Sequence, residues 1–289
     1  MKKIKLRDWL LFGAGLMALL SLTISVRDAA SDETPAFRQA APVSVPIVMY
    51  HSILNDPAAS GAYVISPDLF RSDLLYLKEH GYTTVLTSDL VAYAYDGVPL
   101  PEKPVLVTLD DGYLNNATYV LPILEELDMK AIISVVGAYS ERYTDEPDPR
   151  PSYAYLTWQD IAALSASGHV EIGNHTFAMH QIGARRGCQR MKGESAETYC
   201  SVLRADLEKL QTVLAEQAGV TPIVFAYPYG LCSAECVDVL KELGILAALT
   251  CEETINALTG DPEELYHLGR FNRPAGITTE AFMKRVGIG

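Results

Sequence analysis

Two adjacent carboxylates stand where a short apolar run of the chain ends. Asp110 and Asp111 follow the run Val105–Leu109 and precede Gly112, a residue type that allows a sharp turn. Side chains of adjacent residues on an extended chain point to opposite sides, so one carboxylate can face a metal ion while the other lies beside it. Taken alone, these residues are also compatible with a solvated Asp-Asp-Gly turn.

A pair of histidines favours the metal-site interpretation. His175 and His180 lie five positions apart, directly after the apolar run Val170–Gly173. Neutral imidazoles are common ligands of divalent ions, and groups at the carboxyl ends of parallel strands collect at one edge of a sheet. Two imidazoles and one carboxylate predict a three-ligand site that leaves positions open for water and substrate.

Two further apolar runs end in candidate functional groups. Pro228, Tyr229 and Gly230 form a turn in which the main-chain amide near Tyr229 is a candidate oxyanion donor and the aromatic rings face the substrate. A packed aromatic turn is the alternative. His51, in Met49-Tyr50-His51-Ser52, places a titratable imidazole at the end of the first run, although a capped core histidine remains open.

Short apolar, β-rich runs recur along the chain, and each predicts a buried parallel strand. These runs are Ile47–Tyr50, Val105–Leu109, Ala131–Val136, Val170–Gly173, Ile223–Tyr227 and Leu246–Thr250. Between them, helical periodicity and end signals predict helices from Pro67 to Gly81, from Thr157 to Gly168, through Val202–Leu214 to Gly219, and through Val237–Leu243 to Gly244. The alternation predicts an α/β fold with a parallel sheet. The polar stretches Ser140–Tyr153 and Gly183–Thr198 are predicted to be surface loops.

The N-terminus has the pattern of an export segment. Four basic residues within positions 2–7 precede an apolar run from Trp9 to Val26. The run is long for a signal peptide and short for a spanning helix, so a cleaved signal peptide and an uncleaved membrane anchor both remain open. We therefore expect an export segment at residues 1–26, a linker at 27–44 and one folded domain at 45–289.

Charge and cysteine content limit the classes of function. The net charge of -13 argues against nucleic-acid binding, because phosphate recognition needs clustered Lys and Arg. The five cysteines are an odd number for a chain that reaches an oxidising compartment. Bridges Cys188–Cys200 and Cys232–Cys236 are both possible pairings.

Together the motifs resemble those of the polysaccharide deacetylases of carbohydrate esterase family 4, the NodB-homology domain. Val105–Tyr113 resembles the first family motif, Gly173–His180 the second and Tyr227–Gly230 the third, within a likeness that runs from about Pro46 to the C-terminus. The resemblance implies an irregular (β/α) barrel with a divalent metal, usually zinc, in its mouth. It assigns the ligand positions to Asp111, His175 and His180, and the position of the catalytic base to Asp110.

The spacing of the histidines is similar to that of the branch that acts on poly-β-1,6-N-acetylglucosamine. That branch also starts with a Met-Tyr-His strand, so the resemblance gives His51 the position of the general acid, with His267 as the competing candidate. Ala226 or Tyr227 stands where many members carry an Arg that pairs with the base. Arg270 is a candidate to supply that charge, with an ordinary structural ion pair as the alternative.

The resemblance implies an extracytoplasmic, metal-dependent hydrolase that removes N-acetyl groups from an amino-sugar polysaccharide and releases acetate. An N-acetylated polysaccharide is then the expected partner, and the membrane is a second one if the N-terminal segment is not cleaved. A peptidoglycan or O-acetyl xylan deacetylase of the same fold, and a carbohydrate-binding module with a dead site, remain alternatives.

Overall fold

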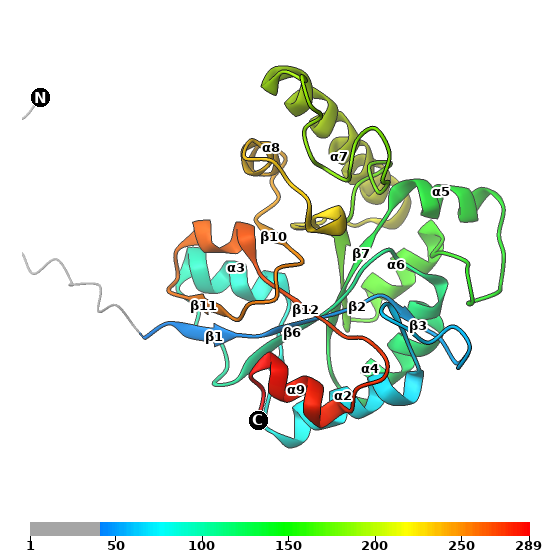
Figure 1. Ribbon diagram of the computed structural model, residues 1–289, viewed down its shortest axis with the longest axis vertical. Coiled ribbons are helices and arrows are strands. Elements are labelled where there is room, and N and C mark those ends of the chain that lie inside the picture. The colour runs from blue at the N-terminus through cyan, green and yellow to red at the C-terminus, as the bar shows by residue number, and fades with distance from the viewer. Residues whose placement is uncertain (1–40) are drawn as a thin grey trace, which may run out of the picture. The chain divides into compact units, whose positions relative to one another are not determined.

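A computed structural model describes residues 41–289 of the chain, and a curled parallel sheet lies at the centre of this part (Figure 1). The predicted export segment and residues 27–40 of the predicted linker lie outside the described residues. In spatial order the strands are β10 (Ala247–Leu249), β9 (Val224–Ala226), β8 (Val170–Asn174), β7 (Ala131–Val135), β6 (Pro104–Leu109), β2 (Ile47–Tyr50) and β12 (Phe271–Asn272). All neighbours in this order are parallel, and β5 (Thr83–Thr84) adds a parallel pairing to β6.

The sheet curls into an irregular barrel. Between its two edge strands, Leu249 of β10 forms a parallel bridge with Leu268, which lies shortly before β12. Two small sheets flank the main one: β1 (Val43–Val45) pairs antiparallel with β11 (Asn256–Leu258), and β3 (Ser52–Ile53) pairs parallel with β4 (Val64–Ile65). The irregular (β/α) barrel expected from the sequence is confirmed, as are the six predicted strands to within two residues at each end.

The two faces of β6 pack into different cores. Val105, Val107 and Leu109 belong to the outer core, which is shared with the helices. Leu106 points to the inner core, to which β2, β7, β9 and β10 also contribute side chains. Because strand side chains alternate, Thr108 and then the residue after the strand continue the inner face. Residue 110 is thereby directed into the barrel.

Helices surround the sheet (Figure 1). They are α2 (Pro67–Glu79), α3 (Thr87–Asp96), the π-helical segment η1 (Asn116–Val120), α4 (Leu121–Leu127), α5 (Gly137–Asp145), α6 (Trp158–Ala166), α7 (Ala196–Ala218), α8 (Cys236–Glu242) and α9 (Thr279–Val286), with short 3-10 segments η2 (Pro228–Gly230) and η3 (Pro262–His267). Helix α2 begins at Ser66, whose Oγ accepts the Leu69 N–H at 3.1 Å. Thr157 and Asp160 form a capping box that starts α6. The four predicted helices are confirmed.

The prediction of a loop at Ser140–Tyr153 is wrong for Ser140–Asp145, which are helical. Helix α5 extends to Asp145, because Tyr139 and Tyr143 lie one helical turn apart and both pack on Tyr155, with ring centroids 4.5 and 5.7 Å away. The second predicted loop, Gly183–Thr198, is correct up to Ser195, whose Oγ caps α7 by accepting the Thr198 N–H.

All five cysteines lie among the described residues, and each is a free thiol. Neither of the two possible bridges is formed. Cys188 and Cys236 are instead buried in an apolar cluster with Tyr199 of α7. Within residues 41–289, no helix has the length and apolar character that a membrane crossing requires.

Candidate active site

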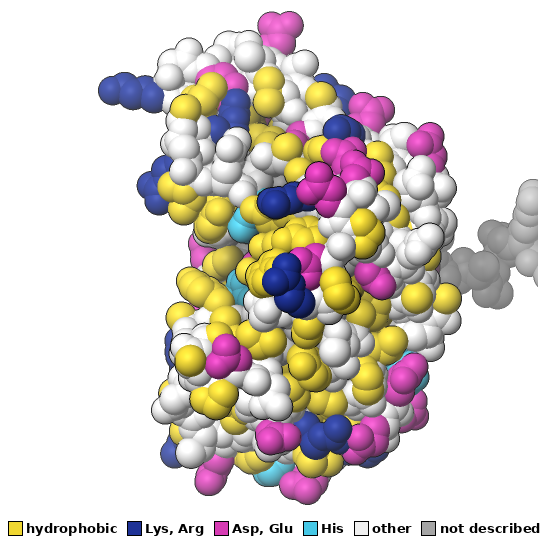
Figure 2. All heavy atoms as spheres, turned by 90° about the vertical axis from the view of Figure 1, so that its right-hand side faces the viewer, with side chains coloured by type: hydrophobic (Ala, Val, Ile, Leu, Met, Phe, Trp, Pro, Cys, Tyr) yellow, Lys and Arg dark blue, Asp and Glu magenta, His cyan; other side chains and the backbone are white. Residues whose placement is uncertain are grey.

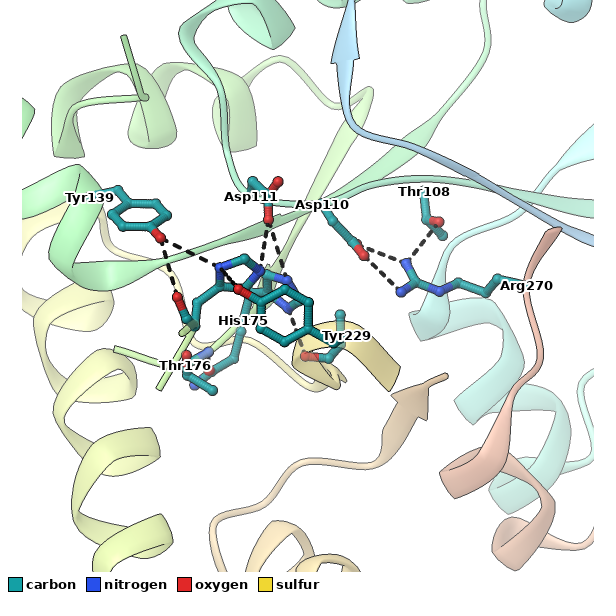
Figure 3. A network of polar contacts seen from close by, with 11 residues as sticks. Thr108, Asp110, Asp111, Tyr139, His175, Thr176, Tyr229 and Arg270 are labelled. Atoms are coloured by element: carbon teal, nitrogen blue, oxygen red, sulfur yellow. Dashed lines mark hydrogen bonds and ion pairs between the residues drawn. The ribbon is translucent and has the colours of Figure 1, made fainter. Parts of the chain in front are cut away.

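The end of β6 directs two carboxylates to different partners. Asp110 continues the inner face of the strand, whereas Asp111 has a φ of 74°, in the left-handed region that few non-glycine residues adopt. Gly112 follows with a φ of 71°, and a Cβ there would lie 3.0 Å from Cγ1 of Val135 on β7. The turn therefore requires glycine, and it sends Asp111 toward His175 while Asp110 faces Arg270 (Figure 3).

Arg270 holds Asp110 in a two-pronged ion pair (Figure 3). Nη1 donates to Oδ1 at 2.8 Å and Nη2 donates to Oδ2 at 2.7 Å, while Nη1 also contacts Thr108 Oγ1 at 3.2 Å. Arg270 is 0% and Asp110 2% exposed. Burial alone would raise the pKa of Asp110, but Arg270 and His175 hold that pKa well below its usual range. Asp110 is therefore ionised and fixed in orientation at neutral pH.

His175, the first residue after β8, presents its Nε2 to Asp111. Its Nδ1 lies 2.7 Å from the carbonyl oxygen of Ala226 at the end of β9, so Nδ1 carries the hydrogen and Nε2 is left as a ligand atom. Nε2 lies 3.6 Å from Asp111 Oδ1. Burial by itself lowers the pKa of His175, but Asp111 and Asp110 more than offset this and raise it.

His180 approaches the same carboxylate oxygen. Its Nε2 lies 3.2 Å from Asp111 Oδ1. The hydroxyls of Tyr139 and Tyr229 each lie 3.5 Å from its Nδ1, and the Tyr139 hydroxyl also donates to the His180 carbonyl at 3.3 Å. The Tyr229 ring packs beside the imidazole with centroids 4.7 Å apart. Burial and the neighbouring His175 lower the pKa of His180. Two tyrosines thus orient this imidazole.

The turn between the two histidines is held by α7. The Asp206 carboxylate accepts the N–H groups of Phe177 at 2.7 Å and Ala178 at 2.9 Å. Burial raises the pKa of Asp206, although these two donors oppose that effect. Sequence analysis missed Asp206. The sequence gives one sign of its role, namely that this acidic residue lies between Leu203 and Leu207, near the apolar side of the helix.

Asp111, His175 and His180 are the one group of three metal-ligating side chains brought together within residues 41–289. Their ligand atoms all lie within 4.8 Å of one another. Around a tetrahedral ion with bonds of about 2.1 Å, ligand atoms lie roughly 3.4 Å apart, and the 3.6 and 3.2 Å separations from Asp111 agree with that spacing. Two imidazoles and one carboxylate therefore fit a divalent metal ion.

The turn after β9 completes the rim of the site. Pro228 is buried, whereas Tyr229 is 40% exposed and has a φ of 59°. The hydrogen-bonded amides of the turn belong to Gly230 and Leu231, which donate to Tyr227 and Pro228. The Tyr229 amide, the candidate oxyanion donor, precedes both in the chain.

Backbone strain is concentrated at the three motifs. Asp111, Thr176 and Tyr229 are three of the four non-glycine residues with positive φ in the described part of the chain. One follows each of β6, β8 and β9. Such conformations persist where the surrounding structure fixes them, and they cluster at functional sites.

His51 lies at the end of β2 and lines the same pocket. The pocket has a volume of about 390 Å³, and its wall includes His51, Asp110, Asp111, His175, His180 and Tyr229. Nδ1 of His51 is buried without a protein hydrogen-bond partner, and burial lowers the pKa of His51 despite the opposing effect of the two aspartates. The rival His267 is exposed at the end of η3 and is not part of this wall.

Tyr63, Tyr113 and Cys251 also line the pocket and were missed by sequence analysis. Tyr113 follows Gly112 directly and belongs to the first motif, so the motif could have identified it as a residue of the site. Tyr63 comes from the loop before β4 and contacts the edge of His51, with ring centroids 4.8 Å apart. No periodicity or spacing marks that loop residue.

A cluster of candidate metal ligands beside a buried carboxylate, at the carboxyl ends of a curled parallel sheet, places the protein in the class of α/β barrel enzymes with an active site at the strand ends. The family model described as polysaccharide deacetylase matches residues 97–248, more than half of the chain, and the chain belongs to this family of hydrolases. The matched span includes Asp110, Asp111, His175 and His180.

Relatives with assigned functions are similar over much of the chain. A poly-beta-1,6-N-acetyl-D-glucosamine N-deacetylase of Escherichia coli (strain K12) is 27% identical over 226 residues, which are 71% of this chain but 33% of that longer protein. The Staphylococcus aureus (strain MRSA252) protein of the same name is 23% identical over 205 residues, 71% of this chain and 66% of its own length.

Solved structures share the fold. A de-N-acetylase from Aggregatibacter actinomycetemcomitans superimposes with a TM-score of 0.70 at 24% identity, covering 84% of this chain and 99% of that one. IcaB from Ammonifex degensii gives a TM-score of 0.65 at 22% identity, covering 86% and 97%. The curled parallel sheet is thus the fold of known deacetylases.

Proposed function

We propose that this protein is a metal-dependent deacetylase that hydrolyses the N-acetyl groups of a poly-β-1,6-N-acetylglucosamine-like polysaccharide and releases acetate. The observation that carries the proposal is the convergence of Asp111, His175 and His180 beside the ionised Asp110 in one pocket. The polysaccharide is inferred from the names of the curated relatives.

Asp111, His175 and His180 are the proposed ligands, and zinc is the proposed ion because it favours imidazole and carboxylate ligands in a tetrahedral arrangement. When bound, such an ion acts as a Lewis acid that polarises a carbonyl and makes water more acidic. The Ala226 carbonyl supports this assignment, since it fixes the tautomer that leaves Nε2 of His175 available.

Asp110 is the proposed general base, which accepts a proton from the attacking water. Its pairing with Arg270 has two opposing consequences. The ion pair keeps the carboxylate ionised and aimed, but the lowered pKa weakens it as a base. Positioning is therefore the larger contribution of Arg270 in this proposal.

His51 and Tyr229 complete the proposed reaction. The carbon–nitrogen bond of the acetamide breaks, and His51 gives a proton to the departing amine. Because burial lowers the pKa of His51, the protonated form that this step needs decreases as pH rises through that lowered pKa. The main-chain amide near Tyr229 donates to the oxyanion that forms on the acetyl carbonyl, and Pro228 fixes the backbone of that turn. The products are acetate and a free amino sugar.

The proposed location is outside the cytoplasm. The basic flank and apolar run of residues 1–26 support export, with the protein either released or held at the membrane by that segment. A location outside the cytoplasm agrees with a polymeric substrate that is too large to enter the cell.

Acetate release by the purified, zinc-loaded chain tests the proposed function. The substrates are β-1,6-linked N-acetylglucosamine oligomers, chitin oligomers, peptidoglycan and O-acetyl xylan, each with and without a chelator. The proposal requires chelator-sensitive release that is fastest on the β-1,6-linked oligomers. Release from peptidoglycan or xylan alone would assign another substrate, and bound oligomer without any release would identify a binding module.

A further inference from the structure

A series of tyrosine rings leads away from the metal-ligand cluster. The centroid of Tyr139 lies 6.1 Å from that of His180 and 4.5 Å from that of Tyr155. Tyr155 in turn stacks on Tyr113 at 4.8 Å, with 23° between the ring planes. Tyr113 lines the active-site pocket, whereas Tyr155 lines a second pocket of about 520 Å³. The two pockets therefore share a wall of stacked tyrosines.

The backbone fixes this wall to the active-site turn. Tyr113 and Tyr155 face each other in an antiparallel bridge, in which the Leu114 N–H donates to Ala154 at 2.8 Å and the Leu156 N–H donates to Gly112 at 2.9 Å. Residues opposite each other in such a bridge place their side chains on the same face. The segment that carries Tyr155 and lines the second pocket is thus hydrogen-bonded directly to the segment that follows Asp111.

The second pocket combines rigid apolar rings with polar groups. Its wall includes Tyr155, Pro147 and Pro149 together with Thr144 and Gln159. Figure 2 faces the side on which α5 lies in Figure 1, and hydrophobic side chains gather there in a band that reaches a hollow with histidine side chains at its edge. The band and the hollow lie on one continuous surface.

The loop beside the pocket is ordered by its own contacts. Asp148 accepts hydrogen bonds from Arg150 Nε at 2.9 Å and from the Tyr153 hydroxyl at 2.8 Å, and the Arg150 guanidinium lies 4.6 Å from the centre of the Tyr153 ring. Burial raises the pKa of Tyr155 to about 12, so its hydroxyl stays neutral and can donate. A ligand would thus meet a preformed surface.

We propose that this second pocket binds a pyranose ring of the same polysaccharide chain whose acetamido group lies at Asp111, His175 and His180, an inference that rests on the proposed deacetylase function. The C–H groups on one face of a pyranose pack on aromatic and proline rings. Its hydroxyls can hydrogen-bond with the exposed Gln159 amide. The subsite makes the enzyme selective for polymer over short fragments.

The test compares two oligomer lengths in variants of the full chain. Gln159 is exposed on α6, so Gln159→Trp fills the pocket without disturbing the tyrosine stack. Tyr155→Ala removes the wall itself, and Gln217→Trp, at an exposed position near the end of α7, is the matched control. We expect kcat/KM for the hexamer of β-1,6-linked N-acetylglucosamine to fall roughly tenfold in the first two variants, mainly through KM. The dimer value of Gln159→Trp and both values of Gln217→Trp should not change. Tyr155→Ala also removes a ring that packs on Tyr139 beside His180, so this variant is judged by the ratio of its hexamer and dimer values.

Equal losses on dimer and hexamer in Gln159→Trp, or the same loss in Gln217→Trp, would overturn the subsite. If Tyr155→Ala fails to fold, Gln159→Trp alone decides. A wild-type chain that releases acetate from no oligomer would instead refute the proposed function. Calorimetric titration with the hexamer then decides the subsite independently, and equal affinity of the wild type and Gln159→Trp would reject it.

Discussion

At the scale of single residues, the three proposed ligands make the sharpest prediction. Replacing His175 or His180 with Ala leaves a two-ligand site that holds a divalent ion poorly, so bound metal should be lost in either variant. Elemental analysis of the purified protein measures this. His80→Ala is the control, because its Nδ1 contacts only the Tyr76 carbonyl at the end of α2 and metal should be retained. Full occupancy in both test variants would refute the ligand assignment.

Asp110→Asn should behave differently. The amide cannot accept a proton as the carboxylate does, so kcat should fall by about 10² to 10⁴ while metal content stays at the wild-type level. Acetate release and elemental analysis on one preparation measure both quantities. Loss of metal instead would mean that Asp110 and Asp111 have exchanged the roles assigned to them.

The choice of general acid separates His51 from His267. His51 lines the pocket and His267 does not, so His51→Ala should lose most of kcat while keeping metal and fold, with a flattened basic limb in the pH profile. His267→Ala should retain near wild-type kcat. Acetate release against pH, with melting temperature as a check on folding, compares the two variants. A His51→Ala protein with wild-type kcat would end this assignment.

The residues that sequence analysis could identify are those that spacing places at strand ends. Asp110, Asp111, His175 and His180 all follow apolar runs, and parallel strands bring their carboxyl ends together. Asp206 could not be found in this way, because it reaches the histidine turn from the middle of α7, and only tertiary packing relates that helix to the turn.

At the scale of secondary structure elements, the position of the histidines depends on α7. Asp206→Ala removes the acceptor of the part-buried Phe177 amide and of the exposed Ala178 amide, and a buried donor left unpaired costs about 1 to 3 kcal/mol. We expect a lower melting temperature and a metal affinity weakened by roughly 10- to 100-fold. Thermal unfolding and competition with a chelator measure the two effects.

Asp238→Ala is the control for Asp206→Ala, since Asp238 is another helical acidic residue that has no role in the turn. It should change neither quantity. If Asp206→Ala lowers the melting temperature but leaves metal affinity unchanged, α7 stabilises the fold without positioning the histidines.

Helices and strands were predictable where the sequence has a local signal, such as an apolar run or a capping residue, and the same residues also pack into the core. Buried runs such as Ala131–Val136 and capped helices such as α6 carry both. Helix α5 was missed because its sequence is largely polar and no side chain caps its start at Val136, and because its packing surface is supplied by Tyr155, which lies beyond the helix. The short strand β12 was missed because two residues carry no period, and its pairing with β2 depends on contacts across the whole chain.

At the scale of the whole molecule, a buried ion pair joins segments 200 positions apart. Arg273, just after β12, donates from Nε to Asp73 Oδ2 on α2 at 2.7 Å, and both side chains are inaccessible to solvent. The Tyr50 hydroxyl also donates to Asp73 at 3.2 Å and the Thr279 hydroxyl at 2.6 Å. This network holds the last strand beside β2, and so places the neighbouring Arg270 opposite Asp110.

Breaking this pair from one side should therefore destabilise the whole domain. Arg273→Ala or Asp73→Ala leaves an uncompensated buried charge, which costs about 3 to 5 kcal/mol and lowers the melting temperature by roughly 10 °C for a unit of this size. The double variant should lose less than the sum of the two single losses, because neither charge is then left unpaired. Thermal unfolding of the four proteins measures this coupling. Additive losses would show that the two residues act independently, and the position of the C-terminal strand would then depend on its pairing with β2 and on the packing of α9 against α2.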